Sequence, residues 1–455
     1  MKHRVQGSRI LLNAYSLLWR LLSPLLCVYL LYRSIRQANY RQHWLERFGF
    51  DLPAFKEQST PVIWIHAVSL GETRALASLL PAIAKRYPSC RLLLTHGTPT
   101  GRQAGKELLL GMTGAFAETQ QCYLPYDNRD WVDRFLEHYR PAIGMIIETE
   151  VWPMLLDRAK ALGVLMLLVS ARLSEKSLVK ARRTRLLIEP ALASFHRILC
   201  QSDRDRQRIL QVAPTAECQV CGNLKFDVQL SEAMIQQGLA WRHHHQDPAE
   251  ISADQPRDRW IIAASTREGE EALLLEQWRA LPNERRKGIV FAIVPRHPQR
   301  FEAIAQLLEL NDPGTWMRRS DHGFPRMTRS IEIVLGDSLG EMAAWYALCD
   351  VVVMGGSLIN TGSQNFIEAC AAGKPVILGP SIYNFEQAAK EAIASGAAIQ
   401  VDASKVLETA CELIEQSGSC QSMGEHAKKF VAAHQGATLR VMAVVDAALE
   451  EKSLS

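Results

Sequence analysis

Residues 350–380, DVVVMGGSLINTGSQNFIEACAAGKPVILGP, are the stretch that predicts the fold of this chain. Residues 351–354 are apolar and mostly β-branched, so they predict a strand buried on both faces, and Gly355 and Gly356 end it. Helical spacing follows over residues 366–372, and a glycine then stops the helix before a second apolar run. This order of strand, helix and strand predicts a parallel sheet with crossover helices.

The polar loop between this strand and this helix is a candidate nucleotide site. Asn365 stands where the helix needs an N-cap, and Glu368 lies in its first turn. Free backbone N–H groups at a helix start attract a phosphate, and Glu368 is placed to accept hydrogen bonds from ribose hydroxyls. An ordinary strand-to-helix turn without a ligand is the alternative, and the pairing of Asn365 with Glu368 favours the nucleotide.

Length and composition predict a globular protein of two domains. A chain of 455 residues is too long for one ordinary core, and its 47% hydrophobic and 22% charged residues are typical of folded proteins. The net charge is only +4, but basic residues gather in positions 1–50 and at Arg182, Arg183 and Arg185. Such clusters suit anionic lipid or a phosphorylated substrate, and because the sequence has no nucleic-acid motif we expect no nucleic-acid partner.

The ten cysteines predict neither a disulfide framework nor a metal site. They are scattered, many of them within apolar runs, as expected of reduced core residues in a cytosolic compartment. Cys218 and Cys221 form a lone C-x-x-C, and three histidines (residues 243–245) follow in a polar stretch, but neither group has a second ligand pair nearby. We therefore expect no bound metal and no cofactor.

Residues 10–32 are the most apolar segment and are about long enough to cross a bilayer. Arg20 and Pro24 interrupt the segment, so a spanning helix and a helix lying in the membrane interface both remain open, with a buried first helix as a third alternative. Aromatic and basic residues follow instead of a small-residue cleavage site, which argues against a signal peptide. Positive charge is heavier after the segment than before it, so we expect the rest of the chain to be cytoplasmic.

Strands and amphipathic helices alternate from residue 61 onwards, which predicts doubly wound α/β sheets. We expect a membrane anchor with its basic flank, a first Rossmann-like domain, a linker and a second Rossmann-like domain, at residues 1–50, 51–230, 231–258 and 259–455 respectively. Each domain has five predicted buried strands, at residues 62–65, 92–95, 143–147, 164–169 and 198–200 in the first, and 260–264, 289–294, 331–335, 351–354 and 375–378 in the second. Ligands in such sheets lie beyond the carboxyl ends of the strands, so we expect the two domains to face each other across a cleft that holds the chemistry.

Carboxylates follow two of the predicted strands of the first domain. Glu72, at the end of HAVSLGE, falls in the first turn after the first strand, where it can take a proton from an attacking hydroxyl. A glutamate at a helix start is also common for electrostatic reasons, and this motif alone does not separate the two interpretations. ETEVWP places Glu148 and Glu150 at the same edge of the sheet, and Lys225 in CGNLKFD can neutralise developing negative charge.

Two loops of the second domain are candidates for binding an anion. Arg296, in PRHP, follows a predicted strand and is a natural partner for a phosphate, whereas His297 beside it more often has a structural hydrogen bond. The loop after another strand, in GDSLGE, contains Gly336, Asp337 and Ser338.

In their order along the chain, these motifs resemble a known family of glycosyltransferases. HAVSLGE, ETEVWP, VSARLS, CGNLKFD, PRHP, GDSLGE and GGSL, followed by Asn365 and Glu368, are arranged as in the lipopolysaccharide Kdo transferases, the 3-deoxy-D-manno-octulosonic acid transferases of the GT-B fold. The resemblance covers nearly the whole chain, including the apolar N-terminal segment. It implies transfer of Kdo from CMP-Kdo to the lipid A precursor (lipid IVA) at the cytoplasmic face of the inner membrane, with inversion and without a metal.

The resemblance also implies roles for particular residues. Glu72 is implied as the general base, Glu148 and Glu150 as supporting carboxylates, and Lys225 as a stabiliser of transition-state charge. The CMP-binding residues that it implies are Pro295, Arg296, Gly336, Asp337, Ser338, Asn365, Phe366, Ile367 and Glu368. A GT-B transferase or epimerase for another nucleotide sugar is the alternative enzyme, and a membrane-bound relative without turnover is the alternative of a different class.

Overall fold

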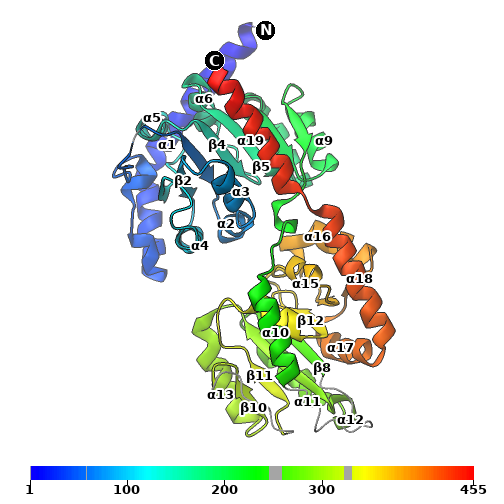
Figure 1. The fold of residues 1–455 in the computed structure, drawn as a ribbon. Coiled ribbons are helices and arrows are strands. Elements are labelled where there is room, and N and C mark those ends of the chain that lie inside the picture. The colour runs from blue at the N-terminus through cyan, green and yellow to red at the C-terminus, as the bar shows by residue number, and fades with distance from the viewer. Residues whose placement is uncertain (1, 58, 245–258, 322–329, 455) are drawn as a thin grey trace. The chain divides into compact units, whose positions relative to one another are not determined.

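The computed structural model describes residues 2–57, 59–244, 259–321 and 330–454. The chain divides into two compact units, one formed by Met1–Asp227 with His434–Ser455 and the other by Val228–Ala433. Each unit contains one parallel sheet covered by helices, which confirms the expected pair of α/β domains (Figure 1).

The first unit is built on a seven-stranded parallel sheet with the order β3-β2-β1-β4-β5-β6-β7. Its strands are β1 (Val62–His66), β2 (Arg91–His96), β3 (Glu118–Tyr123), β4 (Ile143–Ile147), β5 (Leu165–Ala171), β6 (Arg197–Cys200) and β7 (Cys218–Val220). The five predicted strands are present, and the two that were not predicted, β3 and β7, are the two edges. Both edge strands are partly exposed, so they do not form the apolar runs that identify a buried strand.

Alternate side chains of the interior strands enter two different cores. In β1, Trp64 points into one core, whereas Ile63 and Ile65 point into the other. The helices of the unit are α2 (Leu70–Ala75), α3 (Leu79–Arg86), α4 (Pro99–Leu110), α5 (Arg129–Tyr139), α6 (Pro153–Ala161), α7 (Glu175–Arg183), α8 (Arg185–Leu192), α9 (Asp203–Val212) and the short η1 (Ala38–Arg41), η2 (Leu45–Phe48) and η3 (Leu224–Phe226). The core around Trp64 is closed mainly by α5, α6, α8 and α9.

The last helix, α19 (Ala437–Leu454), completes the other core of the first unit, although the sequence placed this segment in the second domain. Its apolar residues Val441 and Val445 are fully buried in that core. Asp227 caps the helix, because its carboxylate accepts hydrogen bonds from the backbone N–H groups of Gly436 (2.7 Å) and Thr438 (2.5 Å). The last residue of CGNLKFD therefore has a structural role.

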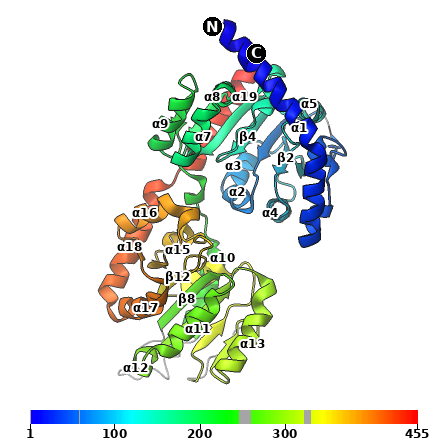
Figure 2. The same cartoon turned by 180° about the vertical axis from the view of Figure 1, so that it is seen from behind.

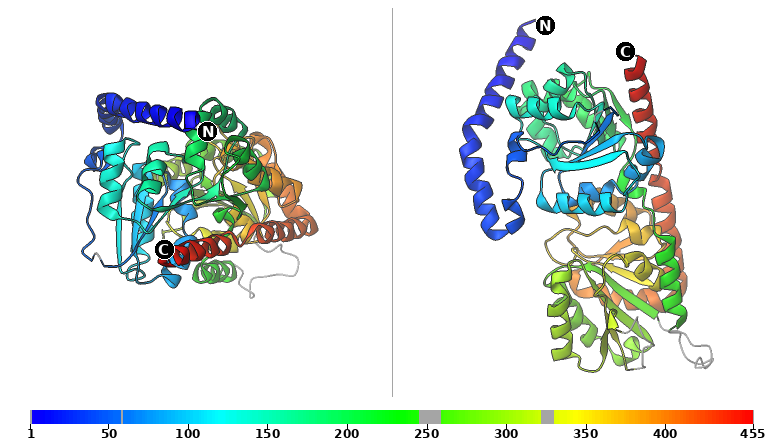
Figure 3. Two further views of the ribbon diagram at one scale, coloured as in Figure 1. Left: turned by 90° about the horizontal axis from the view of Figure 1, so that it is seen from above. Right: turned by 60° about the vertical axis from the view of Figure 1, so that its left-hand side comes forward.

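The long helix α1 (Lys2–Arg36) runs along the outside of the first unit, on the side opposite α19 (Figures 2 and 3). One face of it is fastened to the unit. The side-chain amide of Asn128 donates hydrogen bonds to the carbonyl oxygen (3.0 Å) and the hydroxyl oxygen (3.2 Å) of Ser16. One turn further on, the Trp19 ring stacks on Tyr126 with 5.4 Å between the ring centroids. The helix is thus part of the folded unit and not a separate segment.

The opposite face of α1 is apolar and exposed. Its exposed residues include Leu17, Leu18, Leu21, Leu25, Val28, Leu31 and Ile35. Among the described residues, α1 is the one helix that is long and apolar enough to cross a membrane, judged by length and composition. An exposed apolar surface of this extent is what a lipid-contacting helix presents.

The second unit contains another seven-stranded parallel sheet, with the order β10-β11-β9-β8-β12-β13-β14. Its strands are β8 (Arg259–Thr266), β9 (Ile289–Pro295), β10 (Trp316–Arg318), β11 (Ile333–Leu335), β12 (Val351–Met354), β13 (Val376–Leu378) and β14 (Ala398–Gln400). Again the unpredicted strands, β10 and β14, are the edges. Residues 350–380 contain β12, a loop, α15 (Ile367–Ala371) and β13, as predicted.

Helices cover both faces of this second sheet. They are α10 (Glu232–His244), α11 (Glu270–Ala280), α12 (Asn283–Arg286), α13 (Phe301–Asn311), α14 (Met342–Leu348), α15, α16 (Glu386–Ala394), α17 (Val406–Glu415), α18 (Ser417–His434) and the short η4 (Pro298–Arg300), η6 (Tyr383–Phe385) and η7 (Ala403–Lys405). The expected linker, residues 231–258, contains α10, whose Trp241 packs edge-on against Trp345 of α14, 5.4 Å between centroids. Residues 245–258, including His245, lie outside the described residues.

Candidate active site

Glu72 lies in the first turn of α2, directly after β1, as the sequence predicted. Its side chain is only 8% exposed. One carboxylate oxygen accepts a hydrogen bond from the backbone N–H of Val68 (2.6 Å), and the other accepts from the hydroxyl of Ser69 (3.2 Å). These two bonds fix the direction of the carboxylate and leave it fewer partners than a buried charge needs.

The loop that holds Glu72 is fastened to the neighbouring strand end by residues that the sequence reasoning missed. The carbonyl oxygen of Val68 accepts hydrogen bonds from the backbone N–H groups of Gly97 and Thr98, both 3.1 Å long. A Cβ atom at Gly101 would lie 2.9 Å from the same carbonyl oxygen, so a side chain at this position would push the loop away. The sequence could have indicated this loop, because GTPTG at residues 97–101, with two glycines and two threonines, directly follows a predicted strand.

The pKa of Glu72 is raised from its ordinary value of 4.5 to about 7. Burial is the main cause, and the negative charges of Glu148 and Glu150 add to it. The two neighbouring carboxylates thus lie within electrostatic range of Glu72, and the structure brings together the three acidic residues predicted from separate motifs. A carboxyl group poised near neutral pH can exchange a proton with a substrate under physiological conditions.

Glu148 and Lys225 form an ion pair at this end of the sheet. The ammonium of Lys225 lies 2.5 Å from a carboxylate oxygen of Glu148, and both side chains are mostly buried. Lys225 is held in the short helix η3, where the side chain of Asn223 accepts a hydrogen bond from its backbone N–H (3.0 Å). The predicted cation is therefore present beside the acidic group, already oriented by a charge partner.

The backbone that carries this ion pair is strained. Glu148 follows β4 with a φ of 66°, and Ser170 in β5 has a φ of 53°, values that residues other than glycine seldom adopt. The hydroxyl of Ser170 accepts a hydrogen bond from the backbone N–H of Leu224 (3.2 Å), which places η3 against the strand end. Strained backbone of this kind is concentrated at functional sites, and here it determines where Glu148 and Lys225 meet.

In the second unit, a fully buried carboxylate shapes the glycine loop after β12. Glu270 accepts hydrogen bonds from the backbone N–H groups of Arg267 (2.8 Å), Gly356 (2.7 Å) and Leu358 (2.9 Å). Gly356 has a φ of 74°, and a Cβ atom at Gly355 would lie 2.4 Å from the carbonyl oxygen of Ser265. The loop therefore needs both glycines and Glu270, a residue that the sequence reasoning did not single out.

The predicted nucleotide residues around α15 have different environments. The amide of Asn365 donates to the carboxylate of Glu368 (2.9 Å) and accepts from the backbone N–H of Ile367 (3.2 Å), so Asn365 does cap the helix start. Phe366 and Ile367 have side chains that are completely buried. Phe366 packs against Phe385, with 5.9 Å between ring centroids. These two residues can offer a ligand only backbone groups.

The loops after β9 and β11 lie at the carboxyl ends of adjacent strands. The backbone N–H of Arg296, which follows Pro295, donates to the carbonyl oxygen of Thr266 (3.0 Å). His297 has the structural partner expected of it, because its Nε2 lies 2.7 Å from the guanidinium of Arg267. This pairing joins the loops after β8 and β9.

In the loop after β11, the backbone N–H of Gly336 donates to the carbonyl oxygen of Ile293 (2.8 Å). Asp337 accepts hydrogen bonds from the backbone N–H (2.9 Å) and hydroxyl (2.6 Å) of Ser320, and Ser338 donates to Glu341. The side chain of Asp337 therefore holds neighbouring protein groups.

Throughout residues 2–57, 59–244, 259–321 and 330–454, no group of three or more His, Cys, Asp or Glu side chains is arranged to hold a metal ion.

Comparison with known proteins identifies relatives over nearly the whole length. The sequence model of a family described as 3-deoxy-D-manno-octulosonic-acid transferase (kdotransferase) matches residues 42–228. A 3-deoxy-D-manno-octulosonic acid transferase of Bordetella pertussis is 40% identical over 434 residues, which are 94% of this chain and 97% of that protein. A protein of the same name from Haemophilus influenzae is 28% identical over 447 residues, covering 96% of this chain and 98% of the relative.

The fold also has relatives among solved structures. The UDP-GlcNAc 2-epimerase of Neisseria meningitidis, solved with UDP-GlcNAc bound, superposes with a TM-score of 0.53 over 86% of this chain and 100% of its own. Sequence identity is 13%, so the similarity concerns the fold, which is the expected GT-B arrangement of two Rossmann-like domains.

The raised pKa of Glu72 predicts that this carboxylate destabilises the protein at alkaline pH. The folded state keeps the Glu72 proton up to about pH 7, whereas the unfolded chain loses it near 4.5, so stability falls as the pH rises between these values. Above pH 7 the cost is roughly 3 kcal/mol. We expect Glu72→Gln, which keeps both hydrogen-bonding positions, to melt several degrees higher than the parent protein at pH 8 and at nearly the same temperature at pH 4.

Thermal unfolding in detergent at both pH values measures this difference. Glu107→Gln is the matched control, because Glu107 is an exposed carboxylate on α4 and its substitution should change neither melting temperature. A parent protein at least as stable as Glu72→Gln at pH 8 would show that the Glu72 carboxylate is not under electrostatic stress.

Proposed function

The chain belongs to the family of 3-deoxy-D-manno-octulosonic acid (Kdo) transferases, the glycosyltransferases that add Kdo in lipopolysaccharide biosynthesis, and from this premise we propose its substrates and mechanism. It transfers Kdo from CMP-Kdo to the lipid A precursor lipid IVA, with inversion and without a metal. The observation that carries the proposal is the buried Glu72 carboxyl group. Burial and the charges of Glu148 and Glu150 raise its pKa to about 7, and Glu148 in turn forms an ion pair with Lys225. The identity to relatives of this name favours Kdo over the sugars of other nucleotide donors.

The first unit supplies the base for the reaction. The acceptor hydroxyl oxygen attacks the anomeric carbon of Kdo, and its proton passes to the carboxylate of Glu72. The bond from that carbon to the phosphate oxygen breaks, and its electron pair leaves with CMP. Burial, helped by Glu148 and Glu150, keeps the pKa of Glu72 high enough for proton transfer near neutral pH, and Lys225 stabilises the negative charge that develops. Attack from the face opposite the departing CMP inverts the anomeric centre.

The second unit holds the donor. The backbone at the start of α15, together with Arg296, binds the phosphate, and the carboxylate of Glu368 accepts hydrogen bonds from the ribose hydroxyls. Phe366 and Ile367 contribute through their backbone, because their side chains are buried. Pro295, Asn365 and the loop Gly336, Asp337 and Ser338 complete the contacts to CMP. The support for this assignment is that Glu270 and Asn365 hold these loops in fixed positions before any ligand arrives.

We propose that α1 attaches the enzyme to the inner membrane by lying in the lipid interface, with both units in the cytoplasm. One face of α1 is bonded to the first unit through Ser16 and Trp19, so lipid cannot surround the helix as it surrounds a spanning segment. The opposite face is exposed and apolar, and arginines flank it on both sides. Such a helix lies parallel to the membrane plane, with only its apolar face inserted into the lipid.

The assignment of base and donor residues is tested by two variants that fail in different ways. Glu72→Gln removes the proton acceptor but keeps size, so turnover should fall by roughly two to four orders of magnitude while CMP affinity stays nearly unchanged. Glu368→Ala leaves ribose hydroxyls without partners and should weaken CMP binding by about 1 to 3 kcal/mol. Calorimetric titration with CMP and a rate assay with labelled CMP-Kdo and lipid acceptor measure both. Near-normal turnover of Glu72→Gln would place the base elsewhere, with Glu148 and Glu150 as the next candidates.

The pH dependence of the rate should report on Glu72 directly. Because the base acts only when ionised, the rate should rise with pH through a value near 7. In Glu148→Gln a negative charge beside Glu72 is lost, so the pKa of Glu72 falls and the rising limb should move to lower pH. Ionisation of the acceptor substrate affects the parent enzyme and Glu148→Gln equally. A difference between their pH–rate profiles therefore reports on the pKa of Glu72. An unmoved limb in Glu148→Gln, with Glu107→Gln as the control, would contradict the proposed electrostatic coupling.

Membrane attachment through the apolar face of α1 is tested by making that face polar. Leu18, Leu21 and Leu25 are exposed, so their joint replacement by Gln should leave the first unit folded but move the enzyme from the membrane pellet to the soluble fraction. Deletion of residues 1–32 should have the same effect on location. Leu310→Gln with Leu439→Gln, on exposed leucines of α13 and α19, is the control. If the triple variant still sediments with membranes, the anchor lies elsewhere in the chain.

A further inference from the structure

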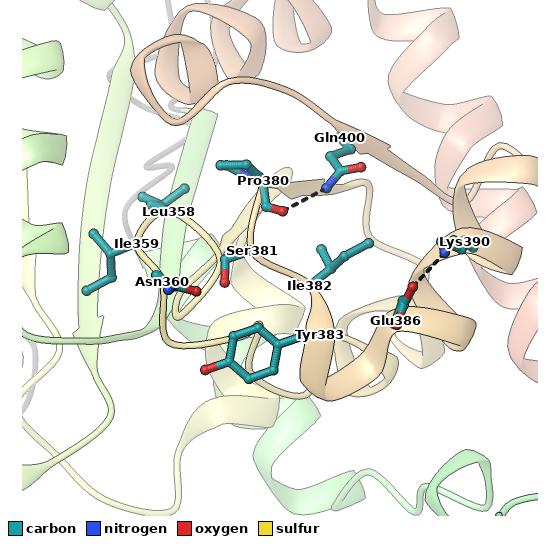
Figure 4. A pocket seen from close by; sticks show the side chains of 10 residues that line it. All are labelled: Leu358, Ile359, Asn360, Pro380, Ser381, Ile382, Tyr383, Glu386, Lys390 and Gln400. Atoms are coloured by element: carbon teal, nitrogen blue, oxygen red, sulfur yellow. Dashed lines mark hydrogen bonds and ion pairs between the residues drawn. The ribbon is translucent and has the colours of Figure 1, made fainter. Parts of the chain in front are cut away.

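A cavity of about 580 Å³ in the second unit lies beyond the carboxyl ends of β12 and β13 (Figure 4). One wall is the loop after β12, including Leu358 and Asn360, and the other is the loop after β13, including Ser381 and Tyr383. Lys390 of α16 stands at the side of the cavity. None of these five residues belongs to the predicted CMP site, and the volume is of the size that a small ligand fills.

The two loops are joined to each other, so the cavity exists before a ligand arrives. The carbonyl oxygen and the hydroxyl of Ser357 accept hydrogen bonds from the backbone N–H groups of Ser381 (2.9 Å) and Gly379 (2.8 Å). In return, the hydroxyl oxygen of Ser381 accepts from the backbone N–H of Gly362 (3.0 Å). A Cβ atom at Gly379 would lie 2.4 Å from the carbonyl oxygen of Ser357, so the close approach of the loops depends on a glycine. The backbone of the two walls therefore needs no reordering when a ligand binds.

The lining combines one cation with groups that bond hydroxyls. Glu386 accepts a hydrogen bond from the Lys390 ammonium (2.6 Å), which has two further protons to donate, and the lysine side chain is exposed. The Ser381 hydroxyl accepts from the backbone and still has its own proton to donate. The amide of Asn360 is exposed, as is the ring of Tyr383. These groups surround an apolar floor that includes Leu358. A carboxylate and several hydroxyls on one small molecule would satisfy this set.

We propose that this cavity is the subsite for the sugar acid of the donor, with Lys390 binding its carboxylate and Asn360, Ser381 and Tyr383 its hydroxyls. The inference rests on the proposed function, because it takes CMP-Kdo as the donor. It follows from the path of one loop: the segment between β12 and α15 ends at the phosphate-binding helix start of that proposal, and the same segment enters the cavity wall at Leu358. In the donor only one oxygen separates the phosphorus from the anomeric carbon, so the sugar must occupy space next to the phosphate.

The full-length enzyme in detergent allows a test that separates the sugar from the nucleotide. Lys390→Gln and Tyr383→Phe should each raise the KM for CMP-Kdo, about tenfold or more for the lysine, which loses a charged hydrogen bond. The constant for inhibition by CMP, which lacks the sugar, should stay within about twofold, since no CMP contact is altered. Lys405→Gln removes an exposed positive charge elsewhere in the same unit and serves as the control.

Glu386→Gln distinguishes substrate binding from a structural role of the lysine. If Lys390 matters only through its ion pair on α16, Glu386→Gln must cause the same defect as Lys390→Gln. If Lys390 binds the carboxylate, Glu386→Gln leaves the KM for CMP-Kdo unchanged or lowers it, because a competing anion is gone. Equal weakening of CMP and CMP-Kdo by Lys390→Gln would assign the cavity to the nucleotide and overturn the proposal, as would an unchanged KM. A parent enzyme that binds CMP but does not use CMP-Kdo would overturn the proposed function first.

Discussion

In each unit, the loops that carry the candidate residues depend on a carboxylate buried directly after the first strand. Glu72 follows β1 and Glu270 follows β8, and both are nearly or completely buried. Burial raises the pKa of Glu270, but the three backbone hydrogen bonds that it accepts offset part of this cost and hold the loop around it. Glu72 accepts hydrogen bonds from only one backbone N–H and one hydroxyl, and the charges of two further carboxylates act on it. The same position thus serves structure in the second unit and, in the proposed mechanism, proton transfer in the first.

Positive φ angles mark the rims of the two sheets in the same way. Glu148, Ser170 and Ser265 all lie at or near the carboxyl ends of strands and all adopt left-handed backbone. Each such residue costs roughly 1 to 3 kcal/mol, and the surrounding hydrogen bonds must hold it in place. In the first unit the strained residues carry the ion pair to Lys225, and in the second Ser265 leaves room only for a glycine at position 355. Stability is given up where the chain has to place side chains with accuracy.

Most of the fold could be predicted from the sequence because buried parallel strands are continuous apolar runs. All ten strands predicted in this way are interior strands, and the four that escaped prediction are the sheet edges, where polar residues such as those of β3 are tolerated. The motifs also located Glu72, Glu148, Glu150 and Lys225 at one end of one sheet. What could not be predicted depends on residues far apart in the sequence. Examples are the burial of Phe366 and Ile367, the backbone hydrogen bonds that Glu270 accepts, and the hydrogen bond from Asn128 that holds α1.

The return of the chain to the first unit at His434 has a consequence for how the protein is made. Because synthesis proceeds from the N-terminus, the whole second unit leaves the ribosome before α19 exists. Until then, one apolar face of the first sheet lacks the helix that contributes Val441 and Val445 to its core. The second unit is continuous in sequence and can fold as it emerges, whereas the first remains open and aggregation-prone. The core of the first unit can therefore be completed only after the whole second unit has been synthesised.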